Sequence, residues 1–275
     1  MNKLVAYKMD GLGNDFIIFD QRKKSVSLSK EQIIKISDRN NIGCDQVIFM
    51  DQDKNHDIFL KFYNSDGGEV SACGNGSRCV AYFLMKENNH KKISLRTNAG
   101  ILQAELNDKN LVSINIGQPN FEWNKIPLIK KMNNKNLEIK INSTHGKEII
   151  GGFSLSVGNP HVIFFVENFD NFNLKKIGPN IENHVFFPEK CNVTLASVKN
   201  KKHIKVKVWE RGAGLTKACG TAACATAVAG SMLNLNDRHV NIEFPEGLLE
   251  INWKKDDSIY MTGKVSEIKK IKVNI

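Results

Sequence analysis

Two cysteines in this sequence lie in nearly identical surroundings, 146 residues apart (219 − 73 = 146). The stretch from Phe62 reads FYNSDGGEVSACGNGSRCVAYF, and the stretch from Val208 reads VWERGAGLTKACGTAACATAVA. Because Ala-Cys-Gly stands at the same place in each copy, Cys73 and Cys219 are expected in equivalent environments, one in each half of a pseudo-symmetric protein. Two opposed thiols can remove a proton from one face of a carbon and deliver another to the opposite face, which inverts a stereocentre.

The repeat extends beyond the two cysteines and predicts a duplicated domain. At the same offset Lys61, Gly68, Ala72, Gly74 and Ala81 fall on Lys207, Gly214, Ala218, Gly220 and Ala227, and Gln46-Val47 falls on Asn192-Val193. With one residue of slippage, Gly13-Asn14 falls on Gly158-Asn159. A period of half the chain excludes a solenoid, whose repeats run to about 20 to 50 residues.

Each cysteine follows a glycine-rich loop and stands at the expected start of a helix. The loops are Asp66-Gly67-Gly68 and Gly212-Ala213-Gly214. Free N–H groups and the positive end of the helix dipole stabilise an anion there, so the same amides can hold a substrate carboxylate. This position is also expected to lower the pKa of the cysteine and to supply thiolate near neutral pH. A single cysteine at a helix start is usually only a small residue, and the duplication is what favours catalysis.

The six cysteines are Cys44, Cys73, Cys79, Cys191, Cys219 and Cys224. A cytosolic chain of this size keeps its thiols reduced, so disulfides are not expected. The spacings Cys73 to Cys79 and Cys219 to Cys224 lack paired C-x2-C knuckles and nearby histidines, which argues against zinc. Cys79 and Cys224 are expected to be small buried residues on helices.

The composition is that of a soluble globular chain of 275 residues, with 41% hydrophobic and 25% charged residues. The formal charge is +10, but the lysines are dispersed and no basic run carries interleaved aromatics, so a nucleic-acid partner is not expected. We find no signal peptide and no apolar run long enough to cross a bilayer. A cytoplasmic protein without a membrane partner is expected.

Short strands are predicted at residues 4–7, 16–20, 47–50 and 58–63, and a helix at 30–38 with Ser27 and Ser29 as candidate caps. Small-residue helices are predicted at 75–86 and 221–233. The second contains so many alanines that other elements can approach it on all sides, which fits a central helix wrapped by strands. Strands follow each helix, at 93–97, 102–106 and 111–116 and at 240–244, 248–253 and 258–263.

These elements predict two domains. The first is expected to span residues 1–117 and the second residues 118–263, with the boundary near Gly117 to Pro119. A last strand within residues 264–275, running from Val265 to Ile275, is expected to return to the first domain, because the second domain already has its set of strands after the helix.

Several segments together resemble diaminopimelate epimerase, in order and over the whole chain: MDGLGNDF, GCDQV, FYNSDGGEVSACGNGSRC, SVGNPH, CNV and ERGAGLTKACGTAAC. The resemblance implies an α+β fold of two pseudo-symmetric domains, each a mixed, mostly antiparallel sheet rolled around a central helix, with the active site in the cleft between them. It implies interconversion of LL- and meso-diaminopimelate in lysine and cell-wall precursor biosynthesis. It also implies a homodimer that uses no metal, no pyridoxal phosphate and no other cofactor.

The same resemblance gives roles to the matched positions. Cys73 and Cys219 would exchange the roles of proton donor and acceptor. Gly74-Asn75 and Gly220-Thr221 would hold the reacting carboxylate through helix amides. The rest of the site would be lined by Asn14, Gln46, Asn64, Asn159, Asn192, Glu210 and Arg211, with Arg211 suited to the distal carboxylate and Asn64 and Glu210 to ammonium groups. His161 either supports this chemistry or is a packed structural histidine.

Two positions depart from the family pattern, which more often has a bulky apolar residue at Cys44 and an acidic residue at Leu215. The alternatives to this interpretation are other isomerases of the same architecture. A phenazine-pathway isomerase lacks the cysteine pair, and a proline racemase has no need of the polar row that ends in Glu210-Arg211. A phosphate- or nucleic-acid-binding protein is a further alternative, but its glycine-rich loops would carry a lysine and Ser or Thr that neither loop here has.

Overall fold

A computed structural model describes residues 3–274 of the chain. The expected start of the first domain at residue 1 and the expected end of the last strand at Ile275 lie outside the described residues. The chain divides into two compact units, the first made of residues 1–115 and 262–275 and the second of residues 116–261. From the sequence, the first domain is expected to end at residue 117 and the segment that returns to it to begin at residue 264. We describe each unit by itself.

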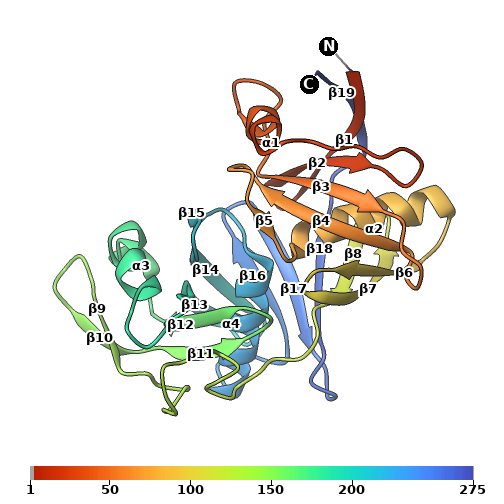
Figure 1. The fold of residues 1–275 in the computed structure, drawn as a ribbon. Coiled ribbons are helices and arrows are strands. Elements are labelled where there is room, and N and C mark those ends of the chain that lie inside the picture. Colours follow the sequence, from red (N-terminus) through yellow and green to blue (C-terminus); the bar gives the residue numbers. More distant parts are fainter. Residues whose placement is uncertain (1–2, 275) are drawn as a thin grey trace. The chain divides into compact units, whose positions relative to one another are not determined.

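Unit 1 contains β1 (Lys3–Gly11), β2 (Asn14–Asp20), α1 (Lys30–Ser37), β3 (Gln46–Asp51), β4 (Ile58–Asn64), β5 (Glu69–Val70), α2 (Gly74–Asn88), β6 (Lys92–Thr97), β7 (Gly100–Asp108), β8 (Leu111–Asn115) and β19 (Lys269–Asn274). Helix α1 begins at Ser29, whose side chain and that of Gln32 form a reciprocal capping box. The other candidate cap, Ser27, lies outside the helix. Strand β1 pairs antiparallel with β19 on one side and with β2 on the other, so both ends of the described chain lie in one sheet (Figure 1).

Unit 2 contains β9 (Ile139–Asn142), β10 (Glu148–Gly151), β11 (Phe153–Ser156), β12 (Pro160–Phe165), η1 (Phe169–Asn171), α3 (Leu174–Glu182), β13 (Asn192–Asn200), β14 (His203–Glu210), β15 (Gly214–Thr216), α4 (Gly220–Met232), β16 (His239–Phe244) and β17 (Gly247–Trp253). The division between the units falls inside β18 (Ile259–Lys264). Strands β9 and β10 pair only with each other among the described residues, and α3 packs on β13, β14 and β15.

The two units repeat one pattern of strand pairing. In unit 1, β2–β3 is parallel, β3–β4 antiparallel, β4–β6 parallel and β6–β7 antiparallel. In unit 2, β12–β13, β13–β14, β14–β16 and β16–β17 follow the same sequence of directions. The register is also repeated, because Phe62 lies opposite Val70 and Val208 lies opposite Thr216, each pair shifted by 146 residues.

A buried helix occupies the core of each unit. Helix α2 packs on β1, β2, β6, β7 and β8, and α4 packs on β11, β12, β13, β16 and β17. Every residue of α4 from Ala222 to Gly230 is buried. Cys79 on α2 and Cys224 on α4 are both fully buried, as predicted. In α2, a Cβ at Gly76 would lie 2.8 Å from Ile48 Cδ1 and 3.1 Å from Phe62 Cε1, so glycine lets the sheet approach the first turn closely.

Candidate active site

The two repeated cysteines are the N-cap residues of the two buried helices. Cys73 precedes α2, and its sulfur accepts a hydrogen bond from the Gly76 amide at 3.5 Å. Cys219 precedes α4 and is only 5% exposed, whereas Cys73 is half-buried. Each sulfur therefore lies at the end of a helix where backbone N–H groups without helical partners gather.

In unit 1, Asn14 connects the cysteine to the first turn of α2. The Cys73 thiol donates to Asn14 Oδ1 at an Sγ to Oδ1 distance of 3.8 Å, and Asn75 Nδ2 donates to the same oxygen at 3.4 Å. Asn14 begins β2 directly after Gly13, whose φ of 77° is a left-handed value that favours glycine. The tight turn between β1 and β2 is therefore what directs Asn14 toward Cys73.

Gln46 and Asn64 form a second polar pair in unit 1. They lie opposite each other on β3 and β4, and Gln46 Nε2 donates to Asn64 Oδ1 at 2.8 Å. Gln46 also lies beside Phe16 in the parallel β2–β3 pairing, two residues from Asn14. Unit 1 thus gathers its predicted site residues into two groups, Asn14 with Cys73 and Asn75, and Gln46 with Asn64.

In unit 2, a chain of polar contacts leads away from the other cysteine. Cys219 Sγ lies 3.4 Å from Thr221 Oγ1, and Asn159 Nδ2 donates to that oxygen at 3.4 Å. Asn159 Oδ1 is 2.9 Å from His161 Nε2, so an Nε2–H tautomer donates to it. Gly158, with φ 95°, precedes Asn159 as Gly13 precedes Asn14. Thr221 and Asn75 occupy the same second position of their helices.

Asn192, Glu210 and Arg211 form the remaining group of unit 2. Asn192 Oδ1 accepts from the Arg211 amide at 3.0 Å, and its Nδ2 donates to the Pro160 carbonyl at 2.9 Å. The exposed Arg211 side chain donates from Nη1 to the Glu189 carbonyl at 3.0 Å. The carboxylate of Glu210 lies close enough to Cys219 to act on its charge.

The electrostatics at Cys219 correct one expectation. A helix start was expected to lower the pKa of the cysteine, but burial raises the pKa of Cys219 well above its usual value of 9.0, and the Glu210 carboxylate raises it further. The hydrogen bond from Thr221 lowers that pKa and does not offset the other two. Cys219 is therefore a thiol, and not a thiolate, at neutral pH.

His161 is fully buried and stays neutral. Burial lowers its pKa from 6.5 to about 3, and the nearby positive charge of Arg211 acts in the same direction. A neutral imidazole with its Nε2–H directed at Asn159 orients that amide. The histidine is packed in the core and bonded to a predicted site residue, and its support of the chemistry stays a prediction.

Sequence reasoning missed two acidic residues next to these groups. Asp45 Oδ2 accepts from Asn14 Nδ2 at 2.9 Å, and the only signal for it was its place before Gln46 in the GCDQV segment. Glu182, 6% exposed, accepts from Trp209 Nε1 at 2.7 Å and from the Gly212 amide at 2.9 Å, which fixes the ends of the segment that contains Glu210 and Arg211. Nothing in the repeated motifs points to Glu182.

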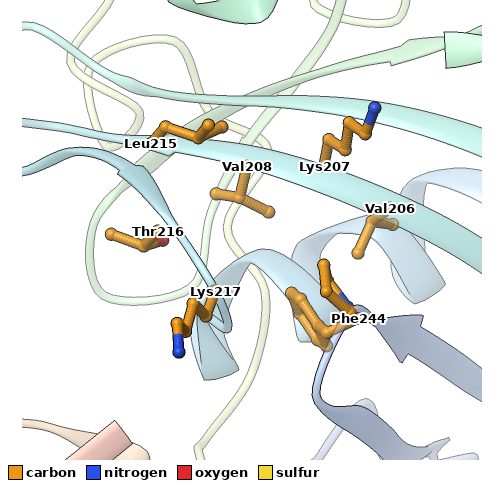
Figure 2. Close-up of a pocket in the computed structure, with 8 residues that line it drawn as sticks. Val206, Lys207, Val208, Leu215, Thr216, Lys217 and Phe244 are labelled. Atoms are coloured by element: carbon orange, nitrogen blue, oxygen red, sulfur yellow. The ribbon is translucent and has the colours of Figure 1, made fainter. Parts of the chain in front are cut away.

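A pocket of about 190 Å³ in unit 2 lies apart from the predicted site residues. Figure 2 shows Val206 and Val208 of β14, Leu215 and Thr216 of β15, and Phe244 around it. The polar residues named above do not line it. Between residues 3 and 274 no group of three or more His, Cys, Asp and Glu side chains could hold a metal ion, and no helix is long and apolar enough to cross a membrane.

Solved structures share this two-domain fold. A phenazine biosynthesis protein of the PhzF family from Bacillus anthracis superposes with a TM-score of 0.71 at 16% identity, over 100% of both chains. A hydroxyproline epimerase from Agrobacterium vitis superposes with a TM-score of 0.66 at 11% identity, over 99% of this chain and 91% of that one. At these identities the likeness shows the fold alone. The protein has the α+β fold of two similar domains found in these structures.

Sequence relatives narrow the class to one family. The diaminopimelate epimerase family profile matches residues 6–122 and 153–268. The chain is 54% identical over 270 residues to a diaminopimelate epimerase from Pelagibacter ubique, covering 98% of each chain. It is 42% identical to a diaminopimelate epimerase from Phenylobacterium zucineum, covering 93% of this chain and 92% of the relative. This chain belongs to the diaminopimelate epimerase family and is an isomerase.

Proposed function

We propose that this protein interconverts LL- and meso-diaminopimelate by proton transfer at the α carbon between Cys73 and Cys219. The observation that carries the proposal is the repeated arrangement of the two thiols. Each caps a buried helix, and each is followed at the second helical position by a polar side chain bonded to an asparagine from a glycine turn. The membership of the chain in the epimerase family supports the substrate.

In the proposed reaction, one cysteine as thiolate takes the α hydrogen as a proton and becomes a thiol. The electron pair of the broken C–H bond stays on the substrate as a carbanion delocalised into the carboxylate. The other cysteine, as thiol, gives its proton to the opposite face of that carbon and becomes a thiolate. Because the raised pKa keeps Cys219 protonated, Cys219 is the donor in the direction in which Cys73 abstracts.

The amides of Gly74-Asn75 and Gly220-Thr221 would hold the reacting carboxylate at the helix starts, where developing negative charge is stabilised. Arg211 would bind the distal carboxylate through its guanidinium fork, and Glu210 and Asn64 would accept from ammonium groups. Asn14, Gln46, Asn159 and Asn192 would complete the lining. We also propose that the enzyme uses neither a metal nor a cofactor, acts as a homodimer in the cytoplasm and serves lysine and cell-wall precursor biosynthesis.

The substrate is tested by comparing diaminopimelate with one-ended amino acids. A site with charged partners for both ends leaves the partners of one end unpaired when that end is missing, which is expected to reduce kcat/KM by about 10⁴-fold. We expect inversion of diaminopimelate by optical rotation and none of alanine, proline or lysine. Comparable turnover of proline would instead support a proline racemase.

The mechanism is tested in heavy water. Early in the reaction the product is expected to carry deuterium at the inverted carbon, whereas unreacted substrate carries little, because the donor thiol exchanges with solvent and the acceptor keeps the abstracted proton. Cys73→Ala and Cys219→Ala should each reduce inversion by about 10³-fold or more. Cys224→Ala, which changes a buried thiol on α4 outside the site, is the matched control and should remain active. Near-normal epimerisation by either of the first two variants would exclude the thiol pair.

A further inference from the structure

The two units differ in the residue that is hydrogen-bonded to the asparagine beside each cysteine. Asn14 and Asn159 match in sequence, in the preceding glycine and in their contact with the second residue of the helix. Their other partners differ. Asn159 is bonded to His161, whereas Asn14 is bonded to Asp45. The position that matches Asp45 in unit 2 is Cys191, a buried residue whose thiol donates to the Ile181 carbonyl instead.

Asp45 decides which end of the Asn14 amide faces Cys73. An asparagine amide has an accepting oxygen and a donating NH₂ of nearly the same shape, so a half-turn exchanges them without a change in packing. An ionised carboxylate can only accept, which requires Asn14 Nδ2 to lie toward Asp45, where it is found at 2.9 Å. The oxygen of Asn14 must then face the Cys73 sulfur, at 3.8 Å.

The Asp45 carboxylate is itself fixed in place. Its Oδ2 accepts from the Asp15 amide at 3.1 Å, and its amide donates to the Asp15 carbonyl at 3.0 Å. Arg39 bridges the carboxylates of Asp45 and Asp15, and Lys8 lies 3.3 Å from Asp15. The acceptor for Asn14 is therefore held by contacts from both its main chain and its side chain.

We propose that Asp45 is a positioning residue of the epimerase reaction, which keeps the donor end of Asn14 away from Cys73 so that the thiolate of Cys73 stays a strong base. An N–H directed at the sulfur would stabilise the thiolate and make it less able to take a weakly acidic α proton. An oxygen directed at the sulfur favours the S–H form instead. This inference rests on the proposed function and adds a role that the two cysteines do not themselves supply.

The test compares Asp45→Asn with the control Lys92→Gln. The first variant replaces the obligatory acceptor by an amide that can also donate, so Asn14 is free to turn over. The second removes an exposed ion pair with Glu105 in the same unit, away from Asn14 and Asp45. We expect kcat for diaminopimelate to fall about tenfold or more in Asp45→Asn, and to stay within about twofold of wild type in Lys92→Gln, because an exposed ion pair contributes little.

The pH dependence of Cys73 alkylation distinguishes a change in the pKa of Cys73 from a general increase in its accessibility. Iodoacetamide reacts with the thiolate, and mass spectrometry assigns the modification to Cys73. In Asp45→Asn the midpoint of the Cys73 profile should move down by about one pH unit, because the turned amide stabilises the thiolate. A purely structural effect would raise the rate at every pH and leave the midpoint unchanged, which would overturn the proposal.

A double-mutant cycle tests whether Asp45 acts through Asn14. In an Asn14→Ala background the Asp45→Asn change should have little further effect on kcat, whereas independent contributions would multiply. If Asp45→Asn does not fold by circular dichroism, Asp45→Ser gives the same comparison. Wild-type rates and an unshifted midpoint in a folded Asp45 variant would overturn the proposal. An inactive wild-type enzyme would instead refute the proposed function.

Discussion

Cys73 and Cys219 have almost the same backbone conformation, with φ −143° and ψ 115° at the first and φ −136° and ψ 113° at the second. Both angles lie in the extended region, as they do for most N-cap residues. The chain has therefore kept the backbone of the two cysteines alike while their side-chain surroundings differ. Cys73 is half-buried beside an amide oxygen, and Cys219 is buried beside a hydroxyl and a carboxylate.

Arg211→Lys should impair turnover although the charge is kept. Lysine offers a single ammonium group, whereas the planar guanidinium can bind a carboxylate through two parallel hydrogen bonds. We expect kcat/KM for diaminopimelate to fall by about 10- to 100-fold, the cost of about 1.4 to 2.8 kcal/mol. Steady-state kinetics measure this effect. Lys217→Arg, which changes an exposed residue paired with Glu246, is the control and should match wild type.

Alkylation of Cys219 should require a high pH. Its raised pKa means that the unreactive thiol persists above the usual value of 9.0, so the rate at pH 7 to 8 should lie far below that of a free cysteine and still be rising at pH 9. Peptide mapping after timed iodoacetamide treatment, with N-acetylcysteine as reference, measures this. A Cys219 profile that reaches its plateau below pH 8 would contradict the buried environment described here.

His161 should make the folded state less stable in acid. Its pKa is about 3 in the folded state and about 6.5 in the unfolded chain, so the unfolded state binds the additional proton between these values. The free energy of unfolding should thus fall as pH falls from about 6.5, at no more than about 1.4 kcal/mol per pH unit from this residue. Urea unfolding at pH 7, 6 and 5 measures the slope. His161→Gln, which keeps a donor for Asn159, should flatten the curve.

Gly76→Ala should destabilise the protein through its Cβ. The added carbon would lie within 3.2 Å of atoms of Ile48, Phe62 and Phe16, all fully buried, so the sheet or the helix must shift. Overpacking of this kind costs about 1 to 3 kcal/mol. Urea unfolding followed by circular dichroism measures it. Gly151→Ala is the control, since no atom lies within 4 Å of its added Cβ, and an equal loss there would contradict the packing argument.

The sequence predicted the elements around the repeat because their signals are local. Ser29 and Gln32 define the start of α1, and the small residues after Cys219 identify a helix buried on all sides. Strand ends differed by a few residues, as for the last strand, expected from Val265 and found from Lys269. The region from residue 118 to Glu210 received no assignment. Its helix α3 contains Pro179 in the interior, and β9, β10 and β11 have only four residues each, so their patterns are short. Strands β13 and β14 have nine and eight residues and were long enough to be predicted, and β14 alternates buried and less buried residues.

The site residues were predicted from the repeat and from the family resemblance. Neither of these indicates the residues that hold the predicted site residues in place. Asp45 has no counterpart in the other half, and Glu182 is remote in sequence from the loop that it holds. The pKa of Cys219 was predicted in the wrong direction for a similar reason. The helix start is visible in the sequence, but the burial that outweighs it depends on packing from many strands.

The pairing of β1 with β19 has a consequence for the order in which the chain can fold during its synthesis. Unit 2 is one continuous segment and is complete once Met261 has left the ribosome. Unit 1 lacks a strand until Val273, which lies opposite Leu4, has emerged. Most domains mature from the amino end as they are made, at about 5 to 20 residues per second. Here the amino-terminal half lacks the partner of one edge of β1 for the whole time that the second unit is being translated, and an unpaired strand edge of this kind can pair with another strand.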